Sequence, residues 1–369
     1  MLFLRKKSND TFIYDKVVDY GKWMYQEKSK PVKFNSTILT SKPWVFPDDV
    51  IYKSIVEACE GCPRIKNIAD VFAGVQPLTT SIYLLRVVGA DEKYEYCVRA
   101  DKKDEIIYKI EKDSLKKLVK GSRDIKKYGH VTDKRLIFPY EIIDGKAKVI
   151  CEEKYKERFP ETYNYLLNFK EQLKCKHTEV SEEKPWYRYA YNKNHTKFEQ
   201  AKILAPAMMY GSRFSYDEKD NIYMTCGGAS SGGGTAITLL EDCDSYTYNA
   251  LLAILNSSLV SYMIIHDGVP KTGGWQGIDK SFLEEIAIPF IGDNVEKKQL
   301  LDVLNKLVIS LDKVLKSEAK SESDEERRKR RIESMLMQID ENVYKLYGIN
   351  NELHLSVLSE LKNGGYLDF

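Results

Sequence analysis

The feature that most constrains the fold is a series of short apolar runs within residues 65–150, separated by turn-forming residues. In chain order the runs are IADVFAGV, SIYLLRVVG, YEYCVRA, IIYKI, RLIFPYEII and GKAKVI. They are rich in Val, Ile and Tyr, which pack well on a pleated, half-buried surface. The pattern predicts a β-rich domain here, and a second β-like region follows over residues 186–290.

Helical spacing marks other parts of the chain. Residues 51–59 (IYKSIVEAC) and 155–175 each show the pattern of one amphipathic helix. Residues 246–265 (YTYNALLAILNSSLVSYMII) predict one buried helix inside the second β-like region. Near the C-terminus, Leu-rich stripes over residues 300–315 and 332–346 predict two long helices.

Between those two long helices, residues 316–331 carry an acidic and then a basic run (DEERRKRR) without apolar periodicity. This predicts a polar joint within a helical hairpin or coiled-coil-like spacer. The fold class expected is α+β. We expect three parts: a helix-and-loop lead-in over residues 1–62, a β-rich domain with packed helices over residues 63–292, and a helical spacer or docking region over residues 293–369.

Composition limits the partners. Lys and Arg number 57 against 55 Asp and Glu, which gives a formal net charge of +2. A chain so close to neutral can bind nucleic acid only through a local basic face. The excess of tyrosine, 25 against 13 phenylalanines, favours β surfaces with one wet and one dry side.

The cysteines and the hydropathy indicate the compartment. Seven scattered cysteines predict free thiols in a reducing environment. Cys59 and Cys62 have the spacing of half a zinc site or of a redox motif, but no second Cys-x-x-Cys completes them, so incidental cysteines are favoured. The first apolar run, MLFL, is too short for a signal peptide, and no window approaches the ~18 apolar residues of a membrane span. We expect a cytoplasmic protein that contacts no membrane.

No motif in the sequence indicates catalytic residues, a cofactor site or a metal site in this chain. The glycine-rich residues 227–234 (GGASSGGG) are not followed by Gly-Lys-Ser/Thr, so a turn between strands is favoured over a phosphate loop. No Gly-x-Gly-x-x-Gly opens a helix after a strand, and FPYE at residues 138–141 lacks key residues of the base-holding motif of amino-methyltransferases. Pro47-Asp48 with Asp91-Glu92-Lys93 matches only the loosest pattern of a metal-dependent nuclease.

Two segments suit contact with nucleic acid, and each has an alternative. Residues 118–129 (LVKGSRDIKKYG) place four basic side chains around a glycine and a serine, which suits phosphate oxygens; the alternative is a solvated turn with one Arg-Asp pair. In residues 271–277 (KTGGWQG) the glycines let the loop lie close to a backbone while Trp275 and Gln276 project toward bases. A hairpin with a packed Trp fits that spacing equally well.

Residues 186–195 read WYRYAYNKNH, and their aromatic and basic content has two interpretations. As a strand, the stretch would place Trp186 and Arg188 on one face and three tyrosines on the other. One interpretation buries an aromatic face; the other presents a polyanion-binding surface. We expect both in part, with the tyrosines packed and the tip at residues 192–195 turned outward.

The order of these pieces resembles the C-terminal target-recognition (TaqI-like specificity) region of adenine-specific DNA methyltransferases and of fused type IIG restriction-modification enzymes. The segments that carry the resemblance are PWVF (43–46), IKNIADVFAGVQPLTTSIYLL (65–85), the basic run at 120–128, LIFPYE (136–141), YNYLLNFKEQL (163–173), WYRYAYNKNHTKFEQAKILAP (186–206), LLAILNSSLVSYMI (251–264), FLEEIAIP (282–289) and IDENVYKLYGI (339–349). The chain departs from the family in lacking its cofactor motif and its Asn/Asp-Pro-Pro-Tyr/Phe motif. Pro77 also stands where relatives often have threonine in a Gly-Ile/Val-x-Thr-Gly turn.

The resemblance implies a specificity subunit or domain that grips duplex DNA and reads its recognition sequence. A separate catalytic domain or subunit, a DNA methyltransferase, would bind S-adenosylmethionine and methylate adenine N6, so this chain is expected to be non-catalytic alone and to be a separate subunit, a fragment or a split-gene product. A restriction subunit is a further expected partner. The residues expected to contact phosphates are Lys120, Arg123, Lys126, Lys127, Lys193, Lys197 and Lys271. Those expected to contact base edges are Tyr189, Asn192, Asn194, His195, Arg213 and Gln276.

Two other function classes stay open from the sequence. One is a protein-interaction module that binds a restriction or methyltransferase subunit through the apolar stripes of its C-terminal helices and never contacts DNA. The other is an independent metal-dependent nuclease, which would cut DNA by itself with magnesium. The DNA sequence recognised does not follow from residue spacing, because base contacts depend on which side chains reach which groove.

Overall fold

The computed structural model describes residues 10–14, 24–25, 32–38, 50–77, 79–100, 106–227, 232–241, 243 and 246–366. The chain divides into two compact units, Met1–Glu57 and Ala58–Phe369. In the first unit, β1 (Thr11–Tyr14) pairs antiparallel with β2 (Val32–Asn35), and the short 3-10 helix η1 (Ser36–Ile38) follows. Helix α2 (Val50–Ala58), expected from its periodicity, begins in this unit and ends at the boundary. The PWVF segment and Pro47-Asp48 lie outside the described residues.

A five-stranded antiparallel sheet, in the order β6-β5-β4-β10-β7, forms the first part of the second unit. Its strands are β4 (Leu84–Ala90), β5 (Tyr94–Arg99), β6 (Tyr108–Glu111), β7 (Leu115–Leu118) and β10 (Lys134–Ile137). The connections include α4 (Thr80–Tyr83), η2 (Lys112–Ser114), α5 (Gly121–Asp124), and the two-stranded pairs β8 (Ile125–Lys126) with β9 (Gly129–His130) and β11 (Tyr140–Ile143) with β12 (Lys146–Val149). The β-rich character predicted for residues 65–150 is confirmed.

The single helix expected over residues 155–175 is wrong, because the structure has three short helices there. They are α6 (Glu152–Arg158), α7 (Pro160–Leu167) and α8 (Lys170–Lys174). Pro160 begins α7, and the residue before it leaves the helical conformation (φ −132°, ψ 61°), as sterics before a proline favour. The sheet supplies the cap: the Glu111 carboxylate accepts hydrogen bonds from the backbone N–H groups of Glu161 and Thr162 at 2.9 and 2.8 Å.

The core between this sheet and these helices is largely aromatic. The rings of Tyr155 and Tyr187 stack with centroids 4.8 Å apart, and those of Tyr83 and Tyr189 meet edge to face at 5.1 Å. Three of the four hydroxyls are satisfied by backbone carbonyls: Tyr83 donates to Tyr187 O (2.9 Å), Tyr187 to Ile150 O (2.7 Å) and Tyr189 to Ile137 O (2.5 Å). The hydroxyl of Tyr155 has no hydrogen-bond partner in the structure. These tyrosines therefore lie inside the core.

A second antiparallel sheet, in the order β15-β13-β16-β3, brings together segments that are distant in the sequence. Its strands are β3 (Ala69–Ala73), β13 (Lys202–Pro206), β15 (Ser215–Asp217) and β16 (Gly234–Leu239); α3 (Ile65–Ile68) leads into β3 and η3 (Lys197–Glu199) precedes β13. Beside it lies the small sheet β14-β18-β17, with strands β14 (Met208–Met209), β17 (Val269–Pro270) and β18 (Gln276–Gly277), and η5 (Thr272–Gly274) between the last two. The segment after the glycine-rich stretch is extended, as expected; residues 228–231 of that stretch lie outside the described part.

The one buried helix expected over residues 246–265 is instead a bent pair, α9 (Tyr248–Leu255) and α10 (Ser258–Asp267), with 56° between them. The side-chain amide of Asn256, at the break, bonds the backbone N–H and the backbone C=O of Phe214. Its Oδ1 accepts from Phe214 N (2.9 Å) and its Nδ2 donates to Phe214 O (2.8 Å). Ser257 then caps α10 by accepting from Val260 N. Within the described residues no one helix has the length and hydropathy to span a membrane, and only this bent pair, counted together, meets that criterion.

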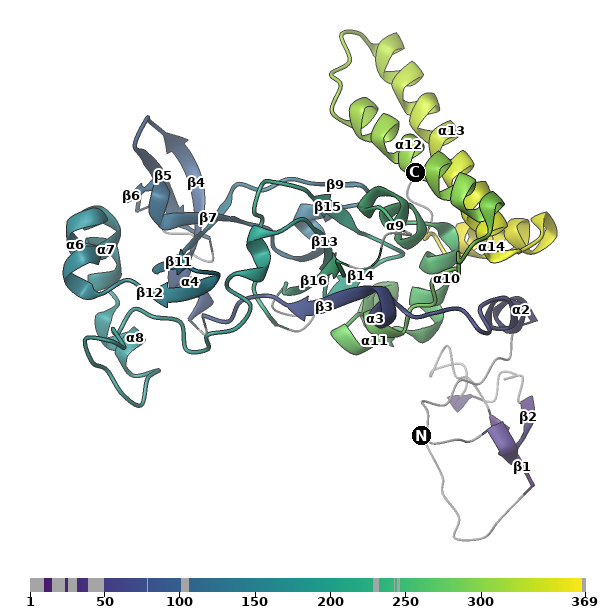
Figure 1. Cartoon of the computed structure of the whole chain (residues 1–369), viewed down its shortest axis with the longest axis horizontal. Helices are drawn as coiled ribbons and strands as arrows, with labels where there is room; N and C mark the ends of the chain where they lie inside the picture. Colours follow the sequence, from purple (N-terminus) through teal and green to yellow (C-terminus); the bar gives the residue numbers. More distant parts are fainter. Residues whose placement is uncertain are drawn as a thin grey trace. The chain divides into compact units, whose positions relative to one another are not determined.

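The C-terminal region is helical. Its helices are α11 (Lys280–Glu285), α12 (Val295–Leu315), α13 (Glu322–Tyr347) and α14 (Asn351–Asn363). Helices α12 and α13 pack as a hairpin and both contact α9, as Figure 1 shows in its green and yellow part. The predicted hairpin is thus present.

The polar joint in this hairpin is shorter than the predicted residues 316–331, because α13 already begins at Glu322. Ser321 caps it by accepting from Asp324 N, and acidic side chains in the first turn suit the helix dipole. Ion pairs at helical spacing follow, Arg327 with Asp324 (2.8 Å) and Arg330 with Glu326 (3.3 Å). An acidic-then-basic run without an apolar stripe therefore forms the exposed start of a long helix.

Every pair of strands within the described sheets is antiparallel, and helices cluster at the C-terminal end. The protein has the α+β fold class expected from its sequence.

Candidate nucleic-acid interface

Residues 186–195 are not a strand, contrary to the alternation drawn from the sequence. They form turns and bends, with only an isolated antiparallel bridge between Tyr191 and Gln76. Trp186 and Tyr187 are both buried, which does not fit a strand with one buried and one exposed face. The Tyr189 hydroxyl donates to the Ile137 carbonyl at 2.5 Å, and only 2% of the residue is exposed. Tyr189 thus belongs to the core, and we do not retain it among the residues expected to contact bases.

The tip of this stretch does turn outward. Asn192 and Lys193 are exposed, and Tyr191 is 46% exposed. Asn194 adopts a left-handed conformation (φ 59°), which Asn tolerates better than most residues, and its Nδ2 donates to the Ala73 carbonyl at 2.8 Å. This bond holds the tip against the end of β3.

Two residues at the end of this stretch, His195 and Lys197, were expected to contact DNA, and the structure places both differently. His195 is only 2% exposed, and burial alone lowers its pKa to about 4. The ammonium group of Lys197 forms an ion pair with Asp70, so its charge is already balanced within the chain. The outward tip is therefore Asn192, Lys193 and half-buried Asn194. Because His195 is buried, contact between it and a base paired in a DNA groove would require the surrounding side chains to move.

Residues 271–277 form the hairpin that was the alternative interpretation. Pro270 pairs with Gln276, and Lys271 N donates to Trp275 O at 2.7 Å. Trp275 is half-buried and packs against Tyr210, with centroids 5.7 Å apart, while the Arg213 guanidinium lies 5.7 Å from the indole centroid. Lys271 is exposed, whereas Gln276 is buried within the small sheet. Of the residues predicted here, Lys271 is the one that presents its side chain to solvent.

The basic turn of residues 118–129 is pinned by Asp124, which is 4% exposed. Its carboxylate accepts from Lys120 N (2.7 Å) and pairs with the Lys134 ammonium (2.8 Å), so the Arg-Asp pair of the alternative interpretation is replaced by a Lys-Asp pair. Arg123 and Lys126 are exposed; Lys120 and Lys127 are half-buried.

The ends of this turn approach different neighbours. An added Cβ on Gly232 would lie 3.0 Å from Lys120 Cγ, so Lys120 lies over the glycine-rich segment. Tyr128 N donates to Phe214 O at 2.9 Å, and strands β8 and β9 pack on β13 and β15. The segment that carries Lys126 and Lys127 is therefore packed on the second sheet, with the Lys126 side chain exposed.

A hollow of about 400 Å³ beside the tip gathers residues that the sequence analysis did not connect. One wall is the β11–β12 hairpin, with Lys146 and Lys148. The other wall comes from the tip and is lined by Asn192, Asn194, His195 and Thr196. Both lysines are exposed, and no ion pair to either is found among the described residues. We call this feature the tip hollow.

Lys146 and Lys148 were missed as site residues although GKAKVI was recognised as a strand. The available signal was the alternation itself, because two lysines separated by one residue on a strand point to the same face. That signal says which side the lysines share, but it does not say what lies opposite them.

A second hollow, of about 300 Å³, is bordered by Ala73 at the end of β3. Its wall includes Ala73, Gly227 and Gly277, with Lys271 and Lys280 at its edge. Lys280 is paired with Glu284 at 3.4 Å, and the exposed Asp279 also lines this hollow, so Lys271 is the lysine here that has no ion pair among the described residues. Ala73 borders this hollow and accepts the bond from Asn194, so the tip and the hairpin loop flank one strand end.

Gly74 allows the backbones at this strand end to meet. An added Cβ would lie 2.3 Å from Thr225 C and 2.4 Å from Met224 O, distances that no side chain tolerates. Parallel bridging of Val75 with Thr225 and the Tyr191–Gln76 bridge complete the junction. Gly74 therefore allows a close backbone approach that any side chain would prevent.

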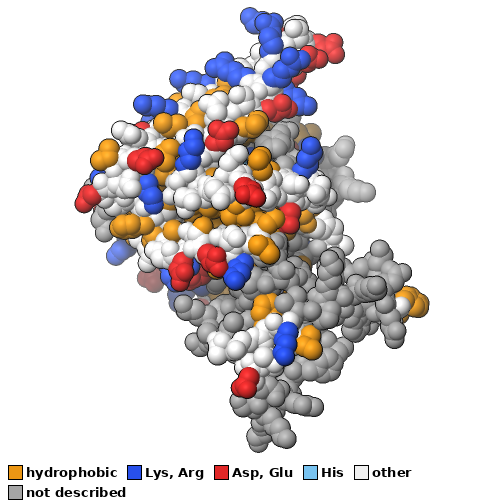
Figure 2. All heavy atoms as spheres, turned by 90° about the vertical axis from the view of Figure 1, so that its right-hand side faces the viewer, with side chains coloured by type: hydrophobic (Ala, Val, Ile, Leu, Met, Phe, Trp, Pro, Cys, Tyr) orange, Lys and Arg blue, Asp and Glu red, His pale blue; other side chains and the backbone are white. Residues whose placement is uncertain are grey.

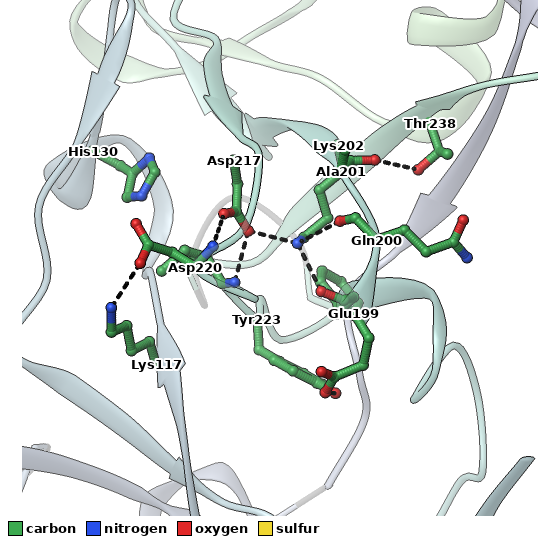
Figure 3. A network of polar contacts seen from close by, with 12 residues as sticks. Lys117, His130, Glu199, Gln200, Ala201, Lys202, Asp217, Asp220, Tyr223 and Thr238 are labelled. Atoms are coloured by element: carbon green, nitrogen blue, oxygen red, sulfur yellow. Dashed lines mark hydrogen bonds and ion pairs between the residues drawn. The ribbon is translucent and has the colours of Figure 1, made fainter. Parts of the chain in front are cut away.

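A buried ion pair fixes the segment that follows the tip (Figure 3). The Lys202 ammonium donates to Asp217 Oδ2 (2.6 Å), Phe198 O (2.7 Å) and Gln200 O (3.1 Å), which uses all three of its protons. Asp217 also accepts from Asp220 N and Ile222 N at 2.9 and 2.7 Å. Desolvation lowers the pKa of Lys202, and the bond to Asp217 opposes that shift. The pair joins β13 to β15 and holds η3 in place.

No group of three or more His, Cys, Asp or Glu side chains suited to a metal ion is found within the described residues. Asp91, considered for a nuclease, instead accepts hydrogen bonds from Lys93 N (2.9 Å), Tyr94 N (2.7 Å) and the Tyr96 hydroxyl (2.7 Å). Burial raises the pKa of the Cys59 thiol to about 12, which opposes the thiolate that redox chemistry needs.

The chain is structurally similar to a solved structure described as the Type IIL restriction-modification enzyme MmeI in complex with DNA. The TM-score is 0.52 and the sequence identity 11%; the match covers 98% of this chain and 41% of that chain. The likeness shows that this chain shares its fold with part of a restriction-modification enzyme. No protein-family model matches the chain, and no curated protein matches it by sequence.

Proposed function

We propose that the chain is a duplex-DNA recognition module of a restriction-modification or adenine-N6 methyltransferase system, of the TaqI-like target-recognition kind. The observation that carries the proposal is the convergence of Lys146, Lys148 and Asn192 on the tip hollow, with Lys193 exposed next to Asn192 and Lys271 on the second hollow, which Ala73 borders. Uncompensated lysines suit phosphates, and exposed amides suit base edges. The fold shared with part of an enzyme described in complex with DNA supports this assignment.

Catalysis in this proposal belongs to another domain or subunit. The chain spans less than half of the length of the structure it resembles, and the remainder of that chain leaves room for catalytic parts. The proposed partners are duplex DNA, a methyltransferase that binds S-adenosylmethionine and, in a system that restricts, a restriction subunit.

A purely protein-binding role is less well supported than the sequence alone indicated. The apolar stripes that suggested it are largely used within the chain: Leu304, Val308 and Leu311 of α12 are buried. In Figure 2, which shows one face of the molecule, basic, acidic and hydrophobic side chains are interspersed, with no single-sign surface. The outer faces of α12 to α14 remain the proposed docking region for the catalytic partner.

A salt titration tests the proposal directly. Affinity of the full chain for a labelled duplex pool is measured by fluorescence anisotropy between about 50 and 200 mM salt, because each phosphate contact contributes about −0.9 to the slope of log K against log salt. The triple variant Lys146→Met, Lys148→Met, Lys193→Met is expected to flatten the slope by about 2.7. The charge-matched control is Lys306→Met, Lys313→Met, Lys320→Met in the helical hairpin, which is expected to leave it unchanged.

Two results would count against DNA recognition. One is the absence of salt-dependent duplex binding, with or without a co-encoded methyltransferase. The other is an equal loss of slope in both triple variants, since that would reflect overall charge rather than the tip hollow.

A further inference from the structure

The tip hollow has an unusual wall residue. His195 contributes to the lining and is 2% exposed, yet neither of its ring nitrogens has a hydrogen-bond partner in the structure. A buried polar atom without a partner is costly, so it normally indicates a bound molecule or a functional role.

Aromatic rings surround the imidazole. The rings of Tyr140, Tyr189 and Phe138 lie at 4.4, 5.3 and 5.7 Å from it, centroid to centroid. Their hydroxyls bond other groups: that of Tyr140 accepts from Tyr189 N (2.6 Å), and that of Tyr189 donates to Ile137 O. None of these side chains forms a hydrogen bond with the imidazole.

Burial keeps the imidazole neutral at physiological pH, because it lowers the pKa to about 4. A neutral imidazole has one N–H donor and one acceptor nitrogen. The two nitrogens point away from each other, so one ligand edge bonds only one of them. Phosphate can only accept from the N–H, whereas a nucleobase edge carries both donors and acceptors and can pair with either ring nitrogen. The imidazole thus suits a nucleobase in both of its tautomers and an anion in only one.

The lysine wall of the hollow favours an anion. Lys146 and Lys148 carry uncompensated positive charge, and Asn192 and Thr196 add polar groups at the same opening. The volume of about 400 Å³ falls in the range of about 300–1,000 Å³ typical of small-ligand sites. Two uncompensated lysines on one wall and an imidazole without hydrogen bonds on the other match a nucleotide with its phosphate at the lysines and its base at His195.

We propose that the tip hollow binds one unstacked nucleotide of a DNA strand, with its phosphate at Lys146 and Lys148 and its base at His195. The inference rests on the proposed function, since it takes the nucleotide from bound DNA. It goes further by assigning His195 to a base that has turned out of the stack. Such a base can enter the hollow as far as His195, whereas a base that stays paired within the duplex cannot. Unstacking costs least at mismatched or unpaired positions, so such DNA is the preferred ligand.

The experiment compares three probes on the full chain: a perfect duplex, the same duplex with one unpaired 2-aminopurine, and deoxynucleoside 5′-monophosphates. Histidine imidazoles labelled with ¹⁵N report hydrogen bonding at the ring nitrogens. The His195 signals are expected to shift with the unpaired-base duplex. His354 is the internal control, because it is also buried without a hydrogen bond at Nε2, which lies 3.9 Å from Asp340 Oδ2, but it is on α14.

Affinity provides the second readout. The unpaired-base duplex is expected to bind about tenfold more tightly than the perfect duplex, which is the scale of one stacked base. His195→Phe is expected to remove that preference while perfect-duplex affinity stays within about twofold. Asn192→Ala, at an exposed position, should reduce the preference without any risk to folding.

The outcomes separate the two proposals. Duplex binding with no His195 shift and no preference for the unpaired base would overturn the nucleotide pocket and leave DNA recognition standing. A His195 shift with monophosphates alone, without duplex binding, would overturn both the DNA source of the ligand and the proposed function. Failure of all three probes would overturn both as well.

Discussion

Replacing Lys202 by methionine should reveal how strongly one buried charge depends on its partner. Methionine keeps most of the side-chain volume but removes the ammonium that donates to Asp217, Phe198 and Gln200. Neither side chain of the pair is more than 1% exposed, so water cannot replace the lost bonds. The variant leaves the Asp217 carboxylate buried with two backbone donors and no cation.

The expected loss of unfolding free energy is about 3–5 kcal/mol, the usual cost of removing one partner from a buried pair. The adjacent pair Lys117–Asp220, at 2.9 Å, provides the control, because its side chains are 48% and 63% exposed. Lys117→Met should cost only about 0–1 kcal/mol. Both values come from urea unfolding followed by circular dichroism and tyrosine fluorescence.

A double-mutant cycle completes the test. Adding Asp217→Asn to Lys202→Met removes the orphan charge, so the double variant should be more stable than the sum of the two single losses predicts. Equal losses for Lys202→Met and Lys117→Met, or strict additivity in the cycle, would refute the account of a buried, mutually dependent pair.

Three further predictions follow from single contacts. The pKa of His195 is about 4 in the folded protein against 6.5 for the free side chain, so between these pH values the unfolded state binds one proton more than the folded state. The free energy of unfolding should therefore fall by about 3 kcal/mol as pH drops from 6.5 to 4. His195→Phe should flatten that part of the stability-pH curve. Gly74→Ala should lower the free energy of unfolding by roughly 1–3 kcal/mol and weaken DNA binding, because its Cβ would push the strand end away from Met224 and Thr225. The control Gly129→Ala, whose Cβ would have nothing within 4 Å, should leave the melting temperature nearly unchanged. Glu111→Gln should cost about 1–2 kcal/mol in urea unfolding because α7 loses its charged cap, and an equal loss in Glu161→Gln, whose side chain is 41% exposed, would contradict that reasoning.

Much of the fold class was accessible to sequence analysis. Short runs rich in Val, Ile and Tyr did form strands, and Leu-rich stripes did form the C-terminal hairpin, because both patterns report local periodicity. Errors came where one side chain redirected the backbone. The Pro160 break was legible in the sequence, but the Asn256 break was not, since it depends on both polar backbone groups of distant Phe214.

The candidate site also combines features that the sequence predicted with features that only the structure showed. The sequence by itself determined that Asn192 and Lys193 would lie in a polar turn after an aromatic segment, because turn-forming residues there leave no apolar face to bury. It did not determine that Tyr189 and His195 would be buried or that Lys197 would be neutralised by Asp70. Those outcomes depend on which distant segments pack against the stretch. Only the tertiary structure placed Lys146 and Lys148 opposite the tip, because burial and charge compensation are properties of neighbours in space, and local periodicity carries no information about them.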